Sequence, residues 1–402
     1  MNAYIVDGIR TPIGNFGGTL SPVRADDLAA MVIKELIKRN SIIGANAIDD
    51  VIMGCVNQAG DDNRNVARMA LLLAGIPYSV PGETVNRLCA SGMSAVVNAA
   101  RAIECSDGNI FITGGVENMT RGPYVISKTS KAYGNDSQMY DSSFGWRFIN
   151  PRMEKMYGVD AMGVTGENLA ELYHISREDQ DAFAYNSQMK AAKATERLAD
   201  EIMPVEVAGK KGAVTVFTND EFIKPSTTIE GLSKLKPAFK KESGTVTAGN
   251  SSGLNDGAAA VLIVSEAALK KYDLQPKAKI IGSAVVGVEP RIMGIGPVDA
   301  TRKALAKAGL TLDDIDIIEL NEAFAAQSIA CIRELGLKDN DARINVNGGA
   351  IALGHPLGMS GARITYTAAL ELQKQNKKYA LATMCIGVGQ GYAVILERSG
   401  PL

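Results

Sequence analysis

A cysteine at position 89 has the sequence context of a reactive thiol. It lies in the segment 86–92 (NRLCASG), where small residues precede an expected amphipathic helix. The positive end of a helix dipole favours thiolate over thiol, and the thiolate is the nucleophile. We therefore expect Cys89 to be a nucleophile, although most free cysteines act as small buried hydrophobes.

Two other segments rich in small residues carry groups that such a thiol needs. Residues 347–358 (NGGAIALGHPLG) contain His355 on a loop whose backbone can approach a ligand closely. The chain has only two histidines, and His174 is expected at a helix end in a structural role. A Cys–His pair must therefore use His355 as its base.

The third segment, residues 385–391 (CIGVGQG), puts Cys385 at the end of an expected strand. The glycine-rich turn that follows exposes backbone N–H groups, which can form an oxyanion hole. Plain tight packing or a phosphate-binding turn are the alternatives. The segment lacks the helix and spacing of a dinucleotide fingerprint, and no GxxxxGK[ST] motif occurs in the chain. Together the three segments indicate thiol-based acyl transfer.

Residues 319–327 (ELNEAFAAQ) follow an apolar strand and place Asn321 at its carboxyl end, where α/β proteins position ligand groups. Its amide could donate to an oxyanion, or it could simply cap a helix. The remaining cysteines, Cys55, Cys105 and Cys331, have no polar or glycine-rich surroundings in sequence, and we expect them to be packing residues.

The composition excludes several classes of protein. The chain has 42 Lys and Arg residues and 44 Asp and Glu residues, which gives a net charge of −2. A protein with this charge would not attract nucleic acid or an anionic membrane. Five cysteines without a CxxC pair, and two histidines, predict neither a disulfide framework nor a metal site. No secretory signal or membrane-length apolar run is evident, so we expect a cytoplasmic protein.

The order of segments predicts an α/β fold built from two similar halves. Helix-like spacing at 24–39 and 66–74 alternates with strand-like runs at 51–54 and 109–115. The pair Ser91-Gly92 recurs 269 positions later as Ser360-Gly361. A strand is expected at Ile110, and another is expected 269 positions after it, at Tyr379. Several such echoes in one order favour an internal duplication.

Between the halves, polar loops and a helix expected at 177–199 indicate an inserted segment. We therefore divide the 402 residues into three parts. Residues 1–120 plus 245–270 form the first α/β half, residues 121–244 the insertion, and residues 271–402 the second half.

Over its full length the chain resembles the thiolase family. The resemblance rests on the motifs around Cys89, Asn321, His355 and Cys385, which are long, specific and in the same order along the chain as in that family. That resemblance implies two α/β halves, each with a mixed five-stranded sheet, stacked in five layers (αβαβα) with a central helical layer. The insertion would be a loop domain that covers coenzyme A. The enzyme would bind no permanent cofactor or metal and would use coenzyme A as co-substrate, as a homodimer or homotetramer.

The resemblance also implies roles for individual residues. Cys89 would be acylated, His355 would take its proton, and Cys385 would be the acid/base at the α-carbon of the acetyl group. Asn321, through a water, and His355 would form one oxyanion hole, and the N–H groups of Cys89 and Gly387 the other. The pocket and coenzyme A contacts would be Lys224, Phe239, Ala248, Ser252, Met162, Met293, Ala323 and Phe324.

The segments 61–70, 144–151 and 157–160 look like those of 3-oxoadipyl-CoA thiolases. Met162-Gly163 instead resembles acetoacetyl-CoA thiolases, so either substrate is expected. A decarboxylating condensing enzyme of the same fold would typically use a second histidine, or His and Asn. A cysteine hydrolase would leave Cys385 without a role, and a coenzyme A-binding scaffold would not need Cys89.

Overall fold

The first half of the chain forms a mixed five-stranded sheet in a computed structural model that describes residues 2–209 and 212–400. Its spatial order is β4 (Gly82–Val85), β3 (Asp50–Gly54), β5 (Ile110–Asn118), β10 (Asn255–Ser265) and β1 (Ala3–Arg10), and the short β2 (Gly14–Asn15) pairs with β10. Strand β3 is parallel to both β4 and β5, whereas β10 is antiparallel to both β5 and β1.

The second half repeats this order and these strand directions. Its strands are β12 (Ile317–Leu320), β13 (Tyr379–Ile386), β14 (Gln390–Arg398) and β11 (Ala278–Gly287). The fifth strand that we expected here is reduced to a single bridge between Ile344 and Ile318. A short pairing of β1 with β11 joins the two halves into one continuous, bent sheet.

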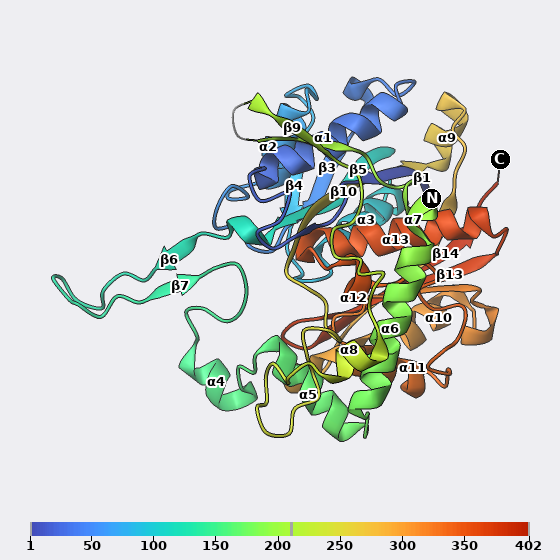
Figure 1. Cartoon of the computed structure of the whole chain (residues 1–402). Helices are drawn as coiled ribbons and strands as arrows, with labels where there is room; N and C mark the ends of the chain where they lie inside the picture. Colours follow the sequence, from blue (N-terminus) through green and yellow to red (C-terminus); the bar gives the residue numbers. More distant parts are fainter. Residues whose placement is uncertain (1, 210–211, 401–402) are drawn as a thin grey trace.

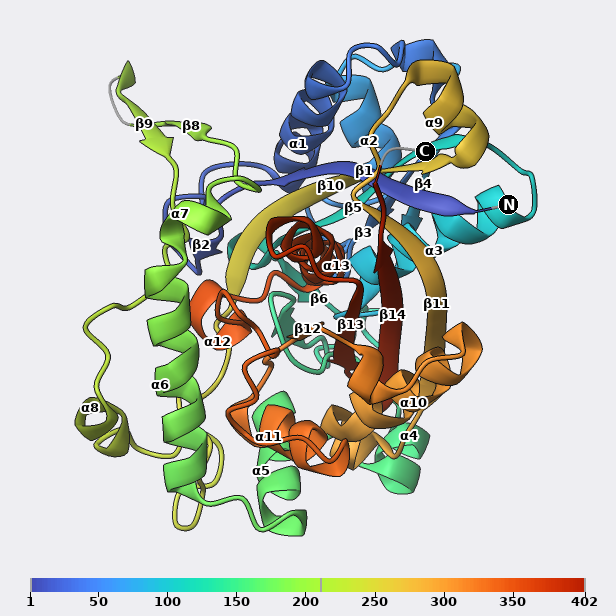
Figure 2. The ribbon, with the colours of Figure 1, turned by 90° about the vertical axis from the view of Figure 1, so that its right-hand side faces the viewer.

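Helices separate and cover the two halves of the sheet, which gives the expected five layers (Figures 1 and 2). Helices α1 (Ala25–Arg39) and α2 (Val66–Leu73) pack on the outer face of the first half. Helices α10 (Gly296–Ala308) and α11 (Ala325–Glu334) cover the outer face of the second. Between them lie α3 (Ser91–Glu104) and α13 (Leu357–Lys374).

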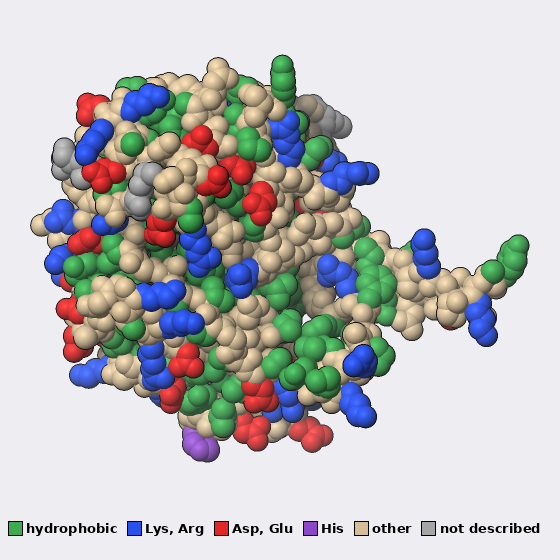
Figure 3. All heavy atoms as spheres, turned by 180° about the vertical axis from the view of Figure 1, so that it is seen from behind, with side chains coloured by type: hydrophobic (Ala, Val, Ile, Leu, Met, Phe, Trp, Pro, Cys, Tyr) green, Lys and Arg blue, Asp and Glu red, His purple; other side chains and the backbone are tan. Residues whose placement is uncertain are grey.

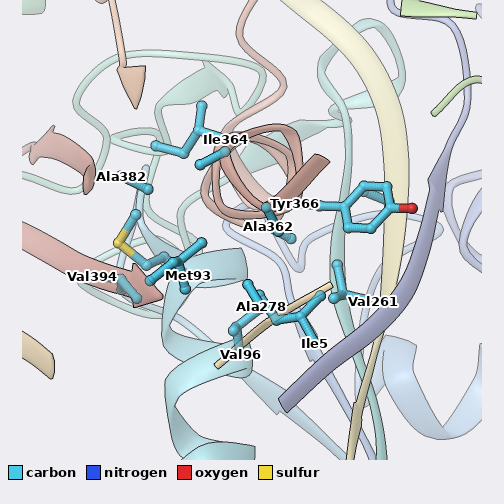
Figure 4. Close-up of a cluster of buried hydrophobic side chains, with 14 of the residues drawn as sticks. Ile5, Met93, Val96, Val261, Ala278, Ala362, Ile364, Tyr366, Ala382 and Val394 are labelled. Atoms are coloured by element: carbon cyan, nitrogen blue, oxygen red, sulfur yellow. The ribbon is translucent and has the colours of Figure 1, made fainter. Parts of the chain in front are cut away.

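The central layer is a buried apolar core between the two halves. Figure 4 shows Met93 and Val96 of α3 facing the same core as Ala362, Ile364 and Tyr366 of α13. Strand residues from both halves close this core: Ile5, Val261, Ala278, Ala382 and Val394. The two central helices are therefore held by both sheets at once.

Small residues let the two central helices approach closely. A Cβ added to Gly92 would lie 2.6 Å from the carbonyl oxygen of Gly358, and one added to Gly361 would lie 2.4 Å from the backbone nitrogen of Met93. Both distances are shorter than any tolerable contact with backbone atoms, so these positions require glycine.

The predicted duplication agrees with the element order. Strands β5 and β13 begin at Ile110 and Tyr379, 269 positions apart as expected. The helix expected to open at Ser360 instead begins at Leu357, directly after Pro356, whose backbone is extended (φ −64°, ψ 113°).

The insertion carries its own short elements and one projecting arm. The arm is the hairpin of β6 (Tyr124–Ile126) and β7 (Met139–Asp141), which extends away from the body in Figure 1. The single helix expected over 177–199 is interrupted at Ala194. The domain boundaries at 121 and 244 stay a prediction.

The remaining elements have these bounds: α4 (Pro151–Tyr157), α5 (Met162–Leu172), α6 (Arg177–Lys193), α7 (Thr195–Leu198), β8 (Val205–Ala208), β9 (Val214–Phe217), α8 (Ile229–Ser233), α9 (Glu266–Tyr272), α12 (Ala350–Leu353), and the 3-10 turns η1 (Ala45–Ala47), η2 (Met119–Arg121), η4 (Pro290–Ile295) and η5 (Leu312–Asp314).

Candidate active site

Cys89 lies in the turn that links β4 to α3, two residues before the helix begins. The Ser91 hydroxyl closes this turn, because it accepts from the Arg87 N–H at 2.9 Å and donates to the Leu88 carbonyl at 2.7 Å. Leu88 adopts a positive φ of 47°. The turn thereby presents Cys89, half-buried, at the N-terminus of a central helix.

The expectation that this position lowers the pKa of Cys89 is wrong. Burial raises the pKa of the thiol to about 11, and the nearby Glu117 carboxylate adds to the rise. The backbone N–H groups of Gly387 and of Cys89 itself oppose the rise only in part. Removal of the thiol from water therefore outweighs the helix N-terminus, and the resting group is a neutral thiol that needs a base.

His355 lies between α12 and α13, at the N-terminus of the other central helix. Gly354 precedes it with a φ of 105°, and a Cβ there would meet the Asn255 side chain at 2.7 Å. The Asn255 amide oxygen accepts the His355 backbone N–H at 2.9 Å. The histidine is thus fixed by the glycine turn that its sequence context predicts, and it is buried.

The hydrogen bonds of His355 define which ring nitrogen is free to accept a proton. Its Nδ1 lies 2.6 Å from the Ser360 hydroxyl, which itself lies 2.9 Å from the Pro356 carbonyl and can donate to it. Its Nε2 lies 3.4 Å from the Asn321 amide nitrogen, which can only donate. These contacts together assign the proton to Nδ1 and leave Nε2 as the acceptor.

Burial lowers the pKa of His355 to about 3, and the positive charge of Arg363 contributes. The imidazole is therefore neutral at physiological pH, as a base must be. Its partner thiol is neutral as well, so the resting pair carries no separated charge.

Asn321 follows β12 directly and is fully buried. It does not cap a helix, because α11 begins only at Ala325 with Phe324 at the cap position. Its amide oxygen has no hydrogen-bond partner among the described residues. An unpaired buried oxygen beside His355 fits a site that takes up a water or a polar ligand atom.

Cys385 lies one residue before the end of β13, as expected, and is buried. Burial raises the pKa of its thiol well above the usual range, and Cys89 is among the neighbouring groups that contribute. The turn after it depends on Gly389, whose φ is 86°. Cys385 is thus a protonated thiol close to Cys89.

A first cavity, of about 320 Å³, is lined by Cys89, His355 and Cys385 together. The structure therefore brings together the two sulfurs and the imidazole that are hundreds of positions apart in sequence. Asn321 does not line it but reaches it through His355. Seven of the eight predicted pocket and coenzyme A contacts line this cavity: Met162, Phe239, Ala248, Ser252, Met293, Ala323 and Phe324.

Lys224 is the predicted contact that the structure does not bring to this cavity. Its ammonium lies 4.8 Å from the centre of the Phe222 ring, and its backbone N–H donates to Gln188. Phe239 and Phe324 instead pack edge-to-face, with ring centres 6.5 Å apart, which gives the cavity a rigid aromatic wall.

A second cavity, of about 330 Å³, is also lined by Cys89, together with Gly387. Trp146 and Arg147 of the insertion also line it, with Phe144 and Met162 shared between both cavities. Cys89 therefore lies in the wall of both cavities.

Several residues of this site were not predicted from the sequence. Glu117 lines the second cavity, and burial raises its pKa to about 7. Its position at the end of a buried strand, after Gly114 and Gly115, is a signal that could have identified it. Ser360 was singled out only as part of the repeated Ser-Gly pair, and its hydrogen bond to His355 Nδ1 is visible only in the folded structure.

Glu117 also belongs to a buried group with Cys55 and Asp62, whose ligand-type atoms all lie within 4.8 Å of one another. The Cys55 thiol lies 3.5 Å from Asp62, and burial raises the pKa of the thiol well above the usual range. The Glu117 oxygens accept the backbone N–H groups of Val56, Asn57 and Gly358. Because the Glu117 oxygens are already engaged by three backbone N–H groups, we interpret this group of residues as a hydrogen-bonded support rather than a metal site.

The chain belongs to the thiolase family. Residues 3–267 match the family model described as "Thiolase, N-terminal domain", and residues 274–398 match "Thiolase, C-terminal domain". Members of this family are acyltransferases, so the fold and the thiol site define an enzyme of that class.

The chain is also similar over almost its whole length to individual proteins of known function or structure. The chain is 58% identical to the 3-oxoadipyl-CoA/3-oxo-5,6-dehydrosuberyl-CoA thiolase of Escherichia coli K12, over 98% of this chain and 99% of that one. It is 57% identical to a beta-ketoadipyl-CoA thiolase of Acinetobacter baylyi, over 99% of each chain. Crystal structures of a Bacillus anthracis acetyl-CoA acetyltransferase and of human mitochondrial 3-ketoacyl-CoA thiolase share its fold, each with a TM-score of 0.91 over 99% of both chains, at 40% and 42% identity.

None of the helices in the described ranges 2–209 and 212–400 is both long and apolar enough to cross a membrane.

The raised pKa of Cys89 predicts a distinctive pH dependence of its alkylation. The rate with iodoacetamide should rise about tenfold per pH unit between about pH 7 and 9, because the thiolate fraction rises in this way below a pKa of about 11. Mass spectrometry of the Cys89 peptide measures the rate, and the exposed Cys105 serves as an internal reference for the reagent. A rate that levels off below about pH 8 would contradict the burial effect.

Proposed function

We propose that the chain catalyses thiolytic cleavage of a 3-oxoacyl-CoA to acetyl-CoA and a shortened acyl-CoA, and the reverse condensation, through an acyl-Cys89 intermediate. The observation that carries the proposal is the single cavity shared by Cys89, His355 and Cys385. The names of the most similar relatives favour 3-oxoadipyl-CoA as the substrate. Acetoacetyl-CoA remains the alternative, because a Syntrophomonas wolfei acetyl-CoA acetyltransferase is also 48% identical.

In the first step, His355 Nε2 takes the proton of Cys89 as the sulfur attacks the 3-keto carbon. The bond between carbons 2 and 3 then breaks, and its electron pair forms the enolate of acetyl-CoA. Cys385 gives its proton to carbon 2 and becomes a thiolate. Because both acid and base start neutral, charge forms only as the bond rearranges, where fixed donors can stabilise it.

In the second step, the Cys385 thiolate takes the proton of the incoming coenzyme A thiol. The coenzyme A sulfur attacks the thioester and releases the Cys89 thiolate, which recovers its proton from His355. All three groups return to their starting state. A thioester intermediate suits this exchange because it keeps the acyl group reactive.

Two sets of donors are placed to stabilise the negative oxygens. The N–H groups of Cys89 and Gly387 would receive the oxygen of the carbonyl that the sulfur attacks, since both groups face that sulfur. His355, once protonated, and a water on Asn321 would receive the enolate oxygen. Removal of one such donor typically costs about 100- to 1,000-fold in kcat.

The alternatives of different chemistry fit the site less well. A decarboxylating condensing enzyme with two histidines would need a second imidazole, but His174 is exposed after the end of α5. One with His and Asn could use His355 and Asn321, but it would leave the Cys385 thiol in the same cavity without a role. A cysteine-dependent acyl hydrolase has no use for the second thiol that the structure buries beside Cys89.

We further propose that coenzyme A serves as a co-substrate without a permanently bound cofactor, and that the enzyme is a cytoplasmic homodimer or homotetramer. The projecting arm supports an oligomer, because its side chains Tyr124, Ile126, Tyr133 and Met139 are apolar or aromatic and exposed. Figure 3 shows the arm standing clear of the body with hydrophobic groups along it.

The substitution Cys385→Ala separates the thiolase proposal from the hydrolase alternative. It should lower thiolytic cleavage by about 100- to 10,000-fold, because the proton donor to carbon 2 is lost. Acetyl transfer from acetyl-CoA to Cys89, measured by intact-protein mass spectrometry, should persist in part. Cys331→Ala, which removes a nearby buried thiol that lines neither cavity, is the matched control. Unchanged cleavage in Cys385→Ala would contradict the proposal.

A comparison of substrates tests the proposed acyl chain. Thiolysis of 3-oxoadipyl-CoA, acetoacetyl-CoA and a medium-chain 3-oxoacyl-CoA is measured side by side with the wild-type enzyme. We expect the highest kcat/KM with 3-oxoadipyl-CoA. Turnover of acetoacetyl-CoA alone would contradict this substrate while leaving the chemistry at Cys89 intact.

A further inference from the structure

We propose that Arg147 binds the distal carboxylate of the acyl chain and thereby selects 3-oxoacyl-CoA substrates that end in a carboxylate. The inference rests on the proposed function and adds a residue that determines specificity at the same site. Three features carry it: the position of Arg147 in the second cavity, the anchoring of its segment, and the lack of an ion-pair partner among the described residues.

The two cavities differ in the charges that line them. The first cavity has no Lys, Arg, Asp or Glu among its lining residues and suits an uncharged pantetheine arm and the reacting centre. The second also contains Cys89, but Arg147 is the cation in its wall. A substrate bound to Cys89 and extended into this second cavity would therefore bring its far end toward a guanidinium.

The segment that carries Arg147 is anchored on both sides. Before it, the Ser142 hydroxyl donates to the Pro123 carbonyl at 2.6 Å, and the Asn57 amide donates to the Ser142 carbonyl at 3.1 Å. Beside it, the indole N–H of Trp146 donates to the Asp160 carbonyl at 3.2 Å. These bonds tie the segment both to the first α/β half and to the start of α5.

The Arg147 guanidinium is half-buried and has no ion pair with any carboxylate in the described parts of the chain. Within the described residues the guanidinium makes one hydrogen bond, and it is long, at 3.4 Å to the Ser142 carbonyl. A guanidinium presents five donors in a fork that matches a carboxylate, so most of its binding capacity is free. Such a group in a partly enclosed cavity gains most from an anionic ligand.

Glu117 is the carboxyl group in the wall of the same cavity, but it is engaged elsewhere. Its oxygens accept three backbone N–H groups, and burial raises its pKa to about 7, which reduces its charge near neutral pH. It therefore does not replace the ligand carboxylate as the partner of Arg147.

A pair of substrates of equal chain length isolates the effect of the carboxylate. 3-oxoadipyl-CoA and 3-oxohexanoyl-CoA share the same carbon chain and the same coenzyme A, and only the first has a distal carboxylate. In Arg147→Gln, the ratio of kcat/KM for 3-oxoadipyl-CoA over 3-oxohexanoyl-CoA should fall about 10- to 100-fold. Arg147→Lys should retain part of the ratio, because the charge remains but the fork is lost.

Arg152→Gln is the matched control, since Arg152 is exposed on the adjacent α4 and lines neither cavity. Its ratio should stay at the wild-type value. An equal loss with both substrates in Arg147→Gln would assign Arg147 to coenzyme A or to loop structure and would overturn the inference. A wild-type enzyme that cleaves 3-oxohexanoyl-CoA but not 3-oxoadipyl-CoA would instead overturn the proposed substrate.

A second measurement avoids any substitution of Arg147. A crystal structure of Cys385→Ala with succinyl transferred to Cys89 should place the succinyl carboxylate within about 4 Å of the guanidinium. A carboxylate that points away from Arg147 would overturn the inference even if the Arg147 variants fail to fold.

Discussion

The close contact between the two central helices is the constraint on which the active site depends. Gly92 and Gly361 lie where α3 and α13 meet, and an added Cβ at either would strike backbone atoms of the other helix. Cys89 precedes α3 and His355 precedes α13. The packing of these two helices therefore fixes the position of Cys89 relative to His355, while both sheets hold the helices from outside.

Burial where the two central helices meet also determines the protonation states of the cysteines and of His355. It keeps Cys89 and Cys385 as thiols and His355 as a neutral imidazole, with pKa values of about 11 for Cys89 and about 3 for His355. A site in this state holds no preformed ion pair that would have to be stabilised before substrate arrives. Cys89 lines both cavities, and in the proposed binding mode the first would hold the uncharged arm of the ligand and the second its acyl end.

The sequence predicted the parts of this account that depend on local pattern. Glycines around His355 and after Cys385, and the repeated Ser-Gly pair, mark backbone positions that few other residues can occupy, so the catalytic segments and the duplication could be found. The pKa of Cys89 could not be found in this way, because it depends on how much water the folded cavity excludes. The segment 144–151 was singled out from the sequence, but no role for Arg147 could be assigned, and Glu117 was missed, since only the fold of the insertion and of β5 brings both residues into the cavity that Cys89 lines.

The rate at which acetyl-CoA acylates Cys89 in Gly92→Ala tests the role of the helix contact most directly. Gly44→Ala is the control, because a Cβ there would meet no atom within 4 Å. With both variants folded by circular dichroism, we predict that single-turnover acylation falls at least about tenfold in Gly92→Ala and is unchanged in Gly44→Ala, since misplacement by about 1 Å can cost 100-fold. A folded Gly92→Ala enzyme that acylates Cys89 at the wild-type rate would contradict the account.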